Sequence, residues 1–471
     1  MIVRENPAHP SEVVGSVPES PPLDVAARVV LAHGAHVDWA RAGIGERSAA
    51  LLRALARLDG ELDDLAVLLA RESGKPRPDC RGELGFALAY ARWVAGRATE
   101  VLQDREIDDD LGRLVERRTP FGVVGAVTPW NAPVLLSMLK VAPALVAGNA
   151  IVVKPSPLSP LAVTRVLTLL AIGLPLGLVQ VVHGGPETGA ALISHPLVRK
   201  VAFTGGEVTG RAIAHLAAER LVPAVLELGG NDPAVFLEDA RLTEEAMDRL
   251  VMASFATSGQ VCMAAKRLYV HRSRYDDFLE AYLAAADRVL VTGDPLEDGV
   301  TVGPLVTRAA ADRVAGLLRE GTVHLLGNSR DLAGGYYVEP ALVTGLDDTA
   351  RLVAEEQFGP VVPLLAFDDE DEVVDRANAG ELGLGASVWS ADEDRAFSLG
   401  RRLEAGFVFV NTHNRTGMSL RAPFGGVKGS GYGREYGDEG LREYTQTCVT
   451  YAPAAFRAGG SGTGAAAYPI G

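Results

Sequence analysis

Helical and β-type hydrophobic patterns occupy different parts of the chain. Over the first hundred residues, alanine, leucine and arginine recur at helical spacing through 49–70 and again through 84–102. Beyond residue 119, short β-branched runs lead into Gly or Pro and then an apolar helix. The runs are VVGAV, AIVV, VQVV and KVAF, and the helices after them span 134–146, 161–170, 188–193 and 210–218. This alternation is typical of a parallel α/β sheet covered on both faces.

A second α/β stretch begins near Gly229. Its expected elements are strand PAVFL, helix 244–258, strand RLYVH, helix 275–289 and strands near 386–389 and 407–410. A chain of 471 residues also favours two or three structural units, at about 150 residues each. We therefore expect an α/β fold with two Rossmann-type parallel-sheet domains in tandem and a cleft between them, the first from 1–103 with 119–228 and the second from 229–440.

Residues 104–118 fit neither domain. They alternate in charge around Ile107, Leu111 and Leu114, which predicts a small projecting hairpin, and the late strand 446–451 is its natural partner. We assign 104–118 and 441–455 to this separate unit. Residues 456–471 form an Ala- and Gly-rich tail that we expect to be poorly ordered in isolation.

Composition narrows the functional classes. With 48% hydrophobic and 22% charged residues, the chain is typical of soluble globular proteins. A net charge of −15 without basic clusters argues against nucleic acid as a partner. The apolar run 166–182 is interrupted by Gly173, Pro175 and Gly177, so it predicts a buried helix followed by a buried strand rather than a membrane span.

The N-terminal sequence and the spacing of the cysteines predict that the protein is located in the cytoplasm. The first fifteen residues lack the basic and then apolar pattern of a signal peptide. Cys80, Cys262 and Cys448 lie far apart and form no CxxC pair, so neither a disulfide framework nor a metal site is expected. A reducing cytoplasm fits best.

Cys262 is a candidate nucleophile. The helix before it should stop at Gly259, which suits a left-handed C-cap, and the next strand starts near Lys266, so Cys262 falls on the connection. Structural cysteines are usually buried in a core, whereas a loop cysteine in SGQVCMAAKR invites reactivity. Position alone leaves nucleophile and bystander both open.

Two polar residues follow apolar strands. Glu227 ends the strand in LVPAVLELGG, where burial would raise its pKa toward neutrality, as a general base for water requires. An ion pair with a nearby Lys or Arg is the alternative. Asn131, between Pro129 and Pro133 in TPWNAP, is a candidate oxyanion donor, although asparagine also occupies turns for conformational reasons alone.

The segment FTGGEVTG, residues 203–210, is the candidate phosphate site. A strand leads to a glycine pair that opens a helix, which would present backbone N–H groups and the positive end of the helix dipole to an anion. No GxGxxG opens a helix, so the standard Rossmann fingerprint is absent. The glycines could simply make a tight turn.

Together these motifs resemble the aldehyde dehydrogenase superfamily over almost the whole chain, from ESGKP at 72–76 to PFGGVKGSGYGREYG at 423–437. The order PWNAP, KPSP, FTGG, ELGG, GQVC, EEQFGP, PFGG is too specific for chance. The resemblance implies that 1–103 with 119–228 bind a dinucleotide, that 229–440 form the catalytic domain, and that 104–118 with 441–455 serve oligomerisation.

The resemblance also implies a mechanism. Cys262 would attack the aldehyde to give a thiohemiacetal, whose oxyanion Asn131 and the Cys262 backbone N–H would hold. Hydride then passes to a nicotinamide, and Glu227 would activate the water that hydrolyses the remaining thioester. Because Glu227 is present, water rather than coenzyme A is the expected acceptor.

Cofactor contacts are implied in the same way. Lys154 and Ser156 resemble adenosine-ribose contacts, Thr204 to Gly206 the loop beneath the pyrophosphate, and Glu356 and Phe358 the nicotinamide contacts. The expected set is Thr128, Pro129, Trp130, Lys154, Ser156, Pro157, Phe203, Thr204, Gly205, Gly206, Thr209, Leu228, Glu356 and Phe358.

Two departures affect this site. Pro157 stands where many relatives carry an acidic ribose acceptor, which leaves the choice between NAD and NADP open; we expect NAD to be preferred. Gly206 replaces a frequent serine.

The substrate is expected to be a bulky or branched aldehyde, or a semialdehyde. Where relatives often carry large aromatics, this chain has Ala132, Leu136 and Leu139, so acetaldehyde should be a poor substrate. In the loop 411–424, Arg415 or Arg421 could clamp a carboxylate, unless they are merely solvated. The expected substrate contacts are Ala132, Leu136, Leu139, Val261, Met263, Arg421 and Phe424.

Two other classes use parts of the same motifs. A redox-free Cys–Glu hydrolase or acyltransferase would need the nucleophile and the base but not FTGG, KPSP or EEQFGP. A non-catalytic member of the fold would have no need of Cys262, Glu227 and Asn131 together.

By analogy with the superfamily we expect a homodimer or homotetramer, with no nucleic acid or membrane as partner.

Overall fold

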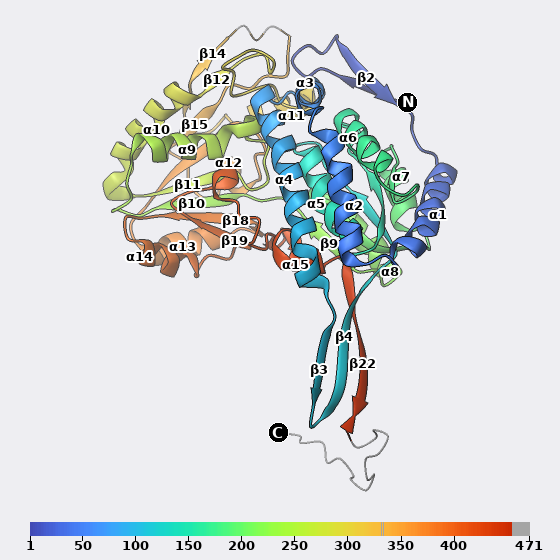
Figure 1. Ribbon diagram of the computed structural model, residues 1–471. Helices are drawn as coiled ribbons and strands as arrows, with labels where there is room; N and C mark the ends of the chain where they lie inside the picture. The colour runs from blue at the N-terminus through green and yellow to red at the C-terminus, as the bar shows by residue number, and fades with distance from the viewer. Residues whose placement is uncertain (331, 333, 455–471) are drawn as a thin grey trace.

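The structure is a computed structural model that describes residues 1–330, 332 and 334–454. It has two α/β lobes side by side, with a long β-ribbon projecting from below the first lobe (Figure 1). The predicted tail, 456–471, lies outside the described residues. Within the described part, no helix is long and apolar enough to cross a membrane.

The first lobe is built on a six-stranded sheet in the order β21-β9-β8-β5-β6-β7. All neighbouring strands are parallel except β21, which pairs antiparallel with β9. The strands are β5 (Val123–Val127), β6 (Ala150–Lys154), β7 (Val179–Val181), β8 (Val198–Thr204), β9 (Ala224–Glu227) and β21 (Gly431–Tyr432). β21 comes from the stretch expected to build the second domain; it joins the first sheet instead, because the chain returns there after completing the second lobe.

Helices cover both faces of this sheet. α5 and α6 pack on one face with α2, α3 and α4 outside them, and α1, α7 and α8 lie on the other. Their bounds are α1 (Pro22–Trp39), α2 (Ile44–Leu55), α3 (Leu62–Ser73), α4 (Arg77–Leu102), α5 (Pro133–Val146), α6 (Leu161–Ile172), α7 (Pro186–Ile193) and α8 (Glu207–Glu219). α6 and β7 confirm that the apolar run 166–182 is a buried helix followed by a strand.

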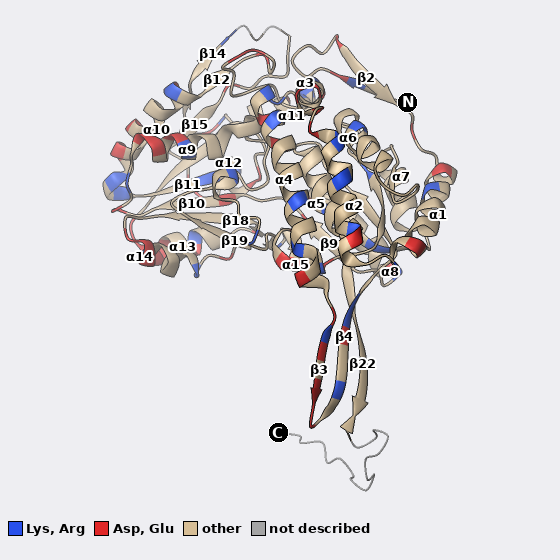
Figure 2. Cartoon of the chain, viewed as in Figure 1, with Lys and Arg blue, Asp and Glu red and all other residues tan. Residues whose placement is uncertain are grey.

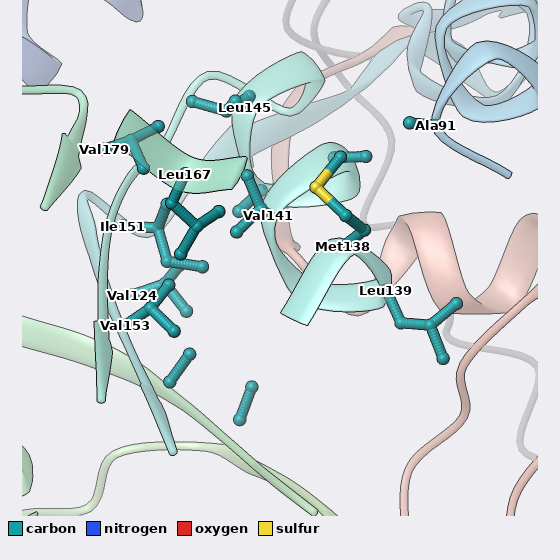
Figure 3. Packing of buried hydrophobic residues seen from close by; sticks show 14 of the residues in the cluster. Ala91, Val124, Met138, Leu139, Val141, Leu145, Ile151, Val153, Leu167 and Val179 are labelled. Atoms are coloured by element: carbon teal, nitrogen blue, oxygen red, sulfur yellow. The ribbon is translucent and has the colours of Figure 1, made fainter. Parts of the chain in front are cut away.

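The core between α5 and the sheet is densely apolar. Val124, Ile151 and Val153 from the strands meet Val141 and Leu145 from α5 (Figure 3). All five side chains are fully buried, because a parallel sheet covered on both faces leaves its strands no solvent side. This packing holds the carboxyl ends of β5, β8 and β9 in fixed positions.

The second lobe has a seven-stranded sheet in the order β13-β15-β16-β11-β10-β18-β19. Only β13, at the edge, is antiparallel to its described neighbour. The strands are β10 (Asp232–Phe236), β11 (Ala265–His271), β13 (Thr322–Leu325), β15 (Ala341–Thr344), β16 (Val361–Phe367), β18 (Gly385–Trp389) and β19 (Phe407–Val410). The helices are α9 (Glu244–Phe255), α10 (Tyr275–Val289), α11 (Arg308–Ala315), α12 (Arg351–Ala354), α13 (Glu370–Asn378), α14 (Glu393–Gly400) and, returning to the first lobe, α15 (Gly437–Arg442).

The projecting ribbon has three strands in the order β22-β4-β3. β3 (Arg105–Asp109) and β4 (Gly112–Pro120) form the predicted hairpin, and β22 (Thr445–Pro453) pairs antiparallel with β4 along its length. Figure 2 shows acidic residues along β3 and basic ones on β4. Cross-strand pairs such as Arg113–Glu106 join the two, which explains the alternating charge of this segment.

The structure differs from the sequence-based expectation at the end of α9 and at the N-terminus. α9 ends at Phe255 rather than near Ser258, because Thr257 and Ser258 adopt left-handed backbone angles with φ of 57° and 58°. The N-terminal strands β1 (Ile2–Glu5) and β2 (Val13–Val17) pair with each other and were not predicted. Short two-stranded pairs also join β12 (Val291–Thr292) to β14 (Asn328–Ser329) and β17 (Leu382–Gly383) to β20 (Val427–Lys428).

Candidate active site

The candidate residues gather where the carboxyl ends of the first sheet face the amino ends of the second. Asn131 follows β5, Thr204 ends β8, and Glu227 ends β9. Cys262 lies on the connection that enters β11 from its amino end. Open α/β sheets place ligand sites at the carboxyl ends of their strands, and here the second lobe closes over that edge.

Two cavities meet at Cys262. An inner one of about 280 Å³ and an outer one of about 210 Å³ both touch Cys262, Asn131 and Thr204. Glu227 lines the inner cavity. The three residues predicted to do chemistry are therefore brought together around one space.

The inner cavity is lined mainly by apolar side chains. Of the predicted substrate residues, Ala132, Leu136, Leu139, Val261, Met263 and Phe424 line it. Sequence reasoning missed Phe86, Leu135, Met418 and Tyr436, which complete the apolar wall. They lie on four separate segments, so no local motif could have revealed them.

The two candidate arginines are placed differently. Arg415 lines the inner cavity, and its guanidinium donates to Asp79 Oδ1 at 3.1 Å. Arg421 is exposed and is not among the residues that line this cavity. Both arginines are exposed, and only Arg415 lines this cavity, so the substrate contact of Arg421 stays a prediction.

The outer cavity is lined by the predicted nicotinamide contacts and by the predicted pyrophosphate loop. Its lining residues are Pro129, Trp130, Asn131, Thr204, Gly205, Gly206, Leu228, Gly229, Cys262, Glu356 and Phe358. The rings of Trp130 and Phe358 meet edge to face at 5.6 Å. Glu356 accepts the N–H of Gly230 at 3.0 Å, and a side chain on Gly229 would collide with its carboxylate, since a Cβ there would lie 2.6 Å from Oε2.

The remaining cofactor candidates lie outside this cavity. Lys154 ends β6, and its ammonium donates to the carbonyls of Pro155 and Gly184 at 3.0 and 2.7 Å; burial lowers its pKa to about 8. Thr128 and Phe203 are buried, Ser156 and Pro157 are half-buried, and Thr209 is exposed in the first turn of α8. Gly206, which does line the outer cavity, is exposed at the N-cap of α8, with open space where a Cβ would stand. A helix N-terminus with this clearance fits the pyrophosphate of a dinucleotide.

A strained turn presents Cys262. Thr257, Ser258 and Gly259 are left-handed in succession, a conformation that a β-branched threonine adopts at a cost. Asp79 of α4 accepts both the N–H and the hydroxyl of Thr257, at 3.0 and 3.3 Å, and Ser258 donates to the Gly303 carbonyl at 2.8 Å. These tertiary contacts stabilise the turn, and they are the physical reason α9 stops early.

Cys262 rests as a thiol. Burial raises the pKa of its sulfur above the ordinary range, and the carboxylates of Asp232, Glu356 and Glu227 add to the effect. A nucleophilic cysteine acts as the thiolate, so this one needs a base that takes its proton.

Glu227 fits that need. Burial, followed by the charge of Glu435, raises the pKa of its carboxyl well above the ordinary value. Neither oxygen has a hydrogen-bond partner among the described residues. The alternative of a local ion pair fails, because the Lys140 ammonium donates to Glu435 and Thr204 instead, at 2.6 and 2.7 Å.

Asn131 is held by residues that sequence reasoning missed. The side-chain amide of Asn131 donates to the Gln260 backbone carbonyl at 3.0 Å. The backbone carbonyl of Asn131 accepts a hydrogen bond from the Lys75 ammonium at 2.9 Å. Lys75 pairs with Glu83, whose other oxygen caps α5 by accepting from Val134 N at 2.8 Å. The available signals were the lysine of ESGKP and a glutamate within the buried stripe of a helix.

Comparison with known proteins decides the family. The profile of the aldehyde dehydrogenase family matches residues 2–449. The chain belongs to the aldehyde dehydrogenase family. This aldehyde dehydrogenase is similar to 3-sulfolactaldehyde dehydrogenase of Pseudomonas putida, with 37% identity over 94% of this chain and 91% of the relative. It is also similar to geranial dehydrogenase of Castellaniella defragrans, with 38% identity over 94% of each chain.

Solved structures agree. A Mycobacterium tuberculosis aldehyde dehydrogenase complexed with NAD+ superimposes with a TM-score of 0.90 at 33% identity, over 97% of this chain and 95% of that one. This aldehyde dehydrogenase is therefore an oxidoreductase that acts on aldehydes with NAD or NADP as acceptor, and its predicted α/β fold is confirmed. A redox-free hydrolase is not favoured.

Proposed function

We propose that this enzyme oxidises a bulky, uncharged, apolar aldehyde to its carboxylic acid, with Cys262 as nucleophile. The observation that carries the proposal is that Cys262, Asn131 and Glu227 line one cavity whose exposed wall is mainly apolar and includes leucine, methionine and aromatic side chains. An apolar substrate gains free energy by leaving water for such a wall, about 25 cal/mol for each Å² buried. Acetaldehyde is too small to fill it.

The first step joins sulfur to carbon. Glu227 takes the Cys262 proton, the thiolate adds to the carbonyl carbon, and the electron pair moves to the carbonyl oxygen. Asn131 and the Cys262 N–H stabilise that oxyanion. The residues that line the outer cavity would hold the nicotinamide of a dinucleotide, which would supply the acceptor for the hydride lost from the carbonyl carbon.

The second step releases the acid from the Cys262 thioester. After it has released the Cys262 proton to solvent, Glu227 removes a proton from water as the water oxygen attacks the thioester carbon. The carbon–sulfur bond breaks, and the Cys262 sulfur takes up the proton that Glu227 removed from the water. A buried carboxyl with a raised pKa suits both proton transfers.

The paired state of Arg415 favours an uncharged substrate over a semialdehyde. A substrate carboxylate would compete with Asp79, which already accepts from Arg415. Among the other ionisable groups that line the cavity, Lys75 pairs with Glu83 and Glu435 pairs with Lys140 of α5, and Glu227 has no partner among the described residues.

A panel of aldehydes tests the substrate class. Large aryl and branched alkyl aldehydes should have a higher kcat/KM than acetaldehyde or a chain-length-matched ω-carboxy aldehyde, as followed by the absorbance of the reduced dinucleotide. Cys262→Ala is the blank. Equal efficiency across the panel, or preference for the carboxylate-bearing member, contradicts the proposal.

For the cofactor, we propose that NAD is preferred to NADP. Acidic residues stand in the first turns of α7 and α8, Glu187 and Glu207, and Glu207 engages Arg211. Carboxylates near the adenosine end would repel a 2′-phosphate. The ratio of kcat/KM for the two dinucleotides measures the preference.

We further propose a cytoplasmic homo-oligomer. Leu111, Val449 and Tyr451 expose apolar surface on the ribbon, which a neighbouring copy could cover. Free Cys80, Cys262 and Cys448 suit a reducing compartment. Sedimentation of the full chain distinguishes a dimer or a tetramer from a monomer.

A further inference from the structure

One tyrosine, Tyr436, lines the inner cavity and has no part in the proposed mechanism. Of the tyrosines that the structure describes, it alone lines either cavity. It stands at the N-cap of α15, and only 4% of its surface is exposed. A polar atom in a mainly apolar pocket usually fixes the orientation of a ligand, so the phenol oxygen needs a partner.

This phenol oxygen forms no hydrogen bond with a described residue. Other tyrosines of the chain are in one of two different states. The phenols of Tyr269 and Tyr336 donate to carboxylates at 3.0 and 2.8 Å, and those of Tyr282 and Tyr444 are sealed from solvent without a partner. The Tyr436 oxygen is in neither state, so it remains accessible from the cavity that its side chain lines.

Packing explains the ring of Tyr436 but not its oxygen. The ring lies edge to face with those of Tyr90 and Phe424, with centroids 5.2 and 6.2 Å apart, and is tilted against Phe86 at 6.3 Å. A phenylalanine would make the same three contacts, because aromatic pairing depends on the ring and on its buried apolar area. The hydroxyl therefore has a separate role.

The backbone of Tyr436 is strained. Its φ is 55° and its ψ is 177°, a region that is essentially restricted to glycine. Hydrogen bonds fix the chain on both sides, since Glu435 and Phe424 exchange two backbone bonds of 2.7 Å and Gly437 donates to the Leu420 carbonyl at 3.0 Å. Glycine would relieve this strain, so the presence of a tyrosine indicates that its side chain is used. Strain of this kind clusters at ligand sites.

The reacting atoms already have partners in the proposed mechanism. Asn131 and the Cys262 N–H hold the oxyanion, and Glu227 activates the water, which leaves the phenol available to the rest of the substrate. Burial, followed by the charge of Glu435, raises the pKa of the phenol. The oxygen therefore keeps its proton and acts as a donor, and the charge of Glu435 disfavours an anionic acceptor beside it.

We propose that the Tyr436 hydroxyl recognises the substrate, and that the apolar body of the aldehyde carries one uncharged oxygen, of an ether, ketone or hydroxyl group, which accepts its hydrogen bond. This inference rests on the proposed oxidation of a bulky aldehyde in the inner cavity, and it narrows that substrate class. A hydrocarbon body of the same size would bury the phenol without a partner, which costs affinity. A body with the oxygen in the right place is bound in preference.

The test combines shape-matched aldehydes with Tyr436→Phe, which removes only the oxygen. Benzaldehydes with a methoxy group at the ortho, meta or para position supply an acceptor, and the corresponding ethyl compounds lack it. The ratio of kcat/KM in the parent to that in the variant cancels the intrinsic reactivity of each aldehyde. For at least one position the methoxy compound should lose about threefold to tenfold, the usual effect of a neutral hydrogen bond, while its ethyl match keeps its kcat/KM.

Binding without turnover provides a second measurement. In the Cys262→Ala background, Tyr436→Phe should weaken the binding of the same methoxy isomer by a similar factor in calorimetric titration. This measurement needs no hydride transfer, so its failure is distinct from failure of the proposed oxidation, which the aldehyde panel measures on the parent enzyme.

Tyr444→Phe is the matched control. It removes a buried phenol oxygen that also lacks a partner among the described residues but lines neither cavity, so it should change none of the ratios. Two outcomes of Tyr436→Phe overturn the proposal. If no methoxy compound loses efficiency, the oxygen meets no part of the substrate; if both members of every pair lose equally, the hydroxyl serves the carbonyl or the water that all aldehydes share.

Discussion

The two cavities that meet at Cys262 are lined by a buried glutamate, Glu227, and a half-buried one, Glu356, and the two carboxylates are held in opposite ways. In the outer cavity Glu356 accepts a backbone N–H from Gly230 at 3.0 Å. In the inner cavity Glu227 has no hydrogen-bond partner among the described residues. Burial raises the pKa of both. A fixed carboxylate suits binding, and an unpartnered one suits proton transfer.

Removing Cys262, which lines both cavities, should have the largest effect on activity. Cys262→Ala deletes the only group that can carry the acyl intermediate, so aldehyde oxidation should fall to background. Because the outer cavity is otherwise intact, dinucleotide affinity measured by titration calorimetry should stay within about twofold. Residual turnover near that of the parent enzyme would mean that the chemistry does not pass through this sulfur.

Exchanging the two glutamates for glutamines should separate their roles. Glu227→Gln should lower kcat by about 10²- to 10⁴-fold, the usual contribution of a general base. Glu356→Gln should act mainly on the KM of the dinucleotide. Steady-state kinetics on both variants makes the comparison, and equal losses of kcat would remove the distinction between the two cavities.

Changing the residues that hold Asn131 should cause the next largest loss of activity. Glu83→Gln weakens the cap of α5 and the hold of Lys75 on the Asn131 carbonyl, so kcat should fall by about tenfold to a hundredfold, as small misplacements of catalytic groups do. Glu72→Gln is a matched control, because Glu72 caps α6 in the same way, accepting from Leu161 N and Ala162 N at 2.8 and 2.9 Å.

Both variants should lose similar stability, about 1 kcal/mol each as for other helix caps, in urea unfolding. Only Glu83→Gln should lose turnover at saturating substrate. An equal loss of kcat in Glu72→Gln would assign the effect to general destabilisation.

The pH dependence should report the inner carboxylate. Glu227 acts as a base only when ionised, and its pKa lies above the ordinary range. The rate should therefore fall as pH decreases through this raised pKa, by about tenfold for each unit below it. A kcat profile that stays flat down to the ordinary pKa of a glutamate would contradict the assignment, and Glu227→Gln should abolish the acid limb.

The smallest effect should come from reshaping the inner wall. Leu136→Phe reduces the space available to a bulky aldehyde, which should change the ratio of kcat/KM for a bulky aldehyde over acetaldehyde by about tenfold in favour of acetaldehyde. Dinucleotide KM should not change, since Leu136 lines the inner cavity and not the outer one. An unchanged ratio would place the substrate elsewhere.

The local sequence pattern predicted the elements that carry the chemistry, but it did not predict contacts between segments that are distant in sequence. The order of strands and helices, and the positions of Cys262, Glu227 and Asn131 at their ends, follow from periodicity, turn residues and motif resemblance. The end of α9 was wrong, because Asp79, far away on α4, binds Thr257. Arg421 was favoured over Arg415 as a substrate contact, because loop sequence does not show which arginine lines the cavity.

The sequence by itself determined the alternation of buried strands and amphipathic helices, the family, and which side chains are chemically competent. Only the tertiary structure decided their electrostatic environment: that Glu227 has no hydrogen-bond partner among the described residues while Glu356 has one, and that Lys75 and Glu83 hold Asn131. The physical reason is that hydrophobic periodicity is a property of neighbours along the chain, whereas desolvation and charge depend on groups that only folding brings within a few ångströms.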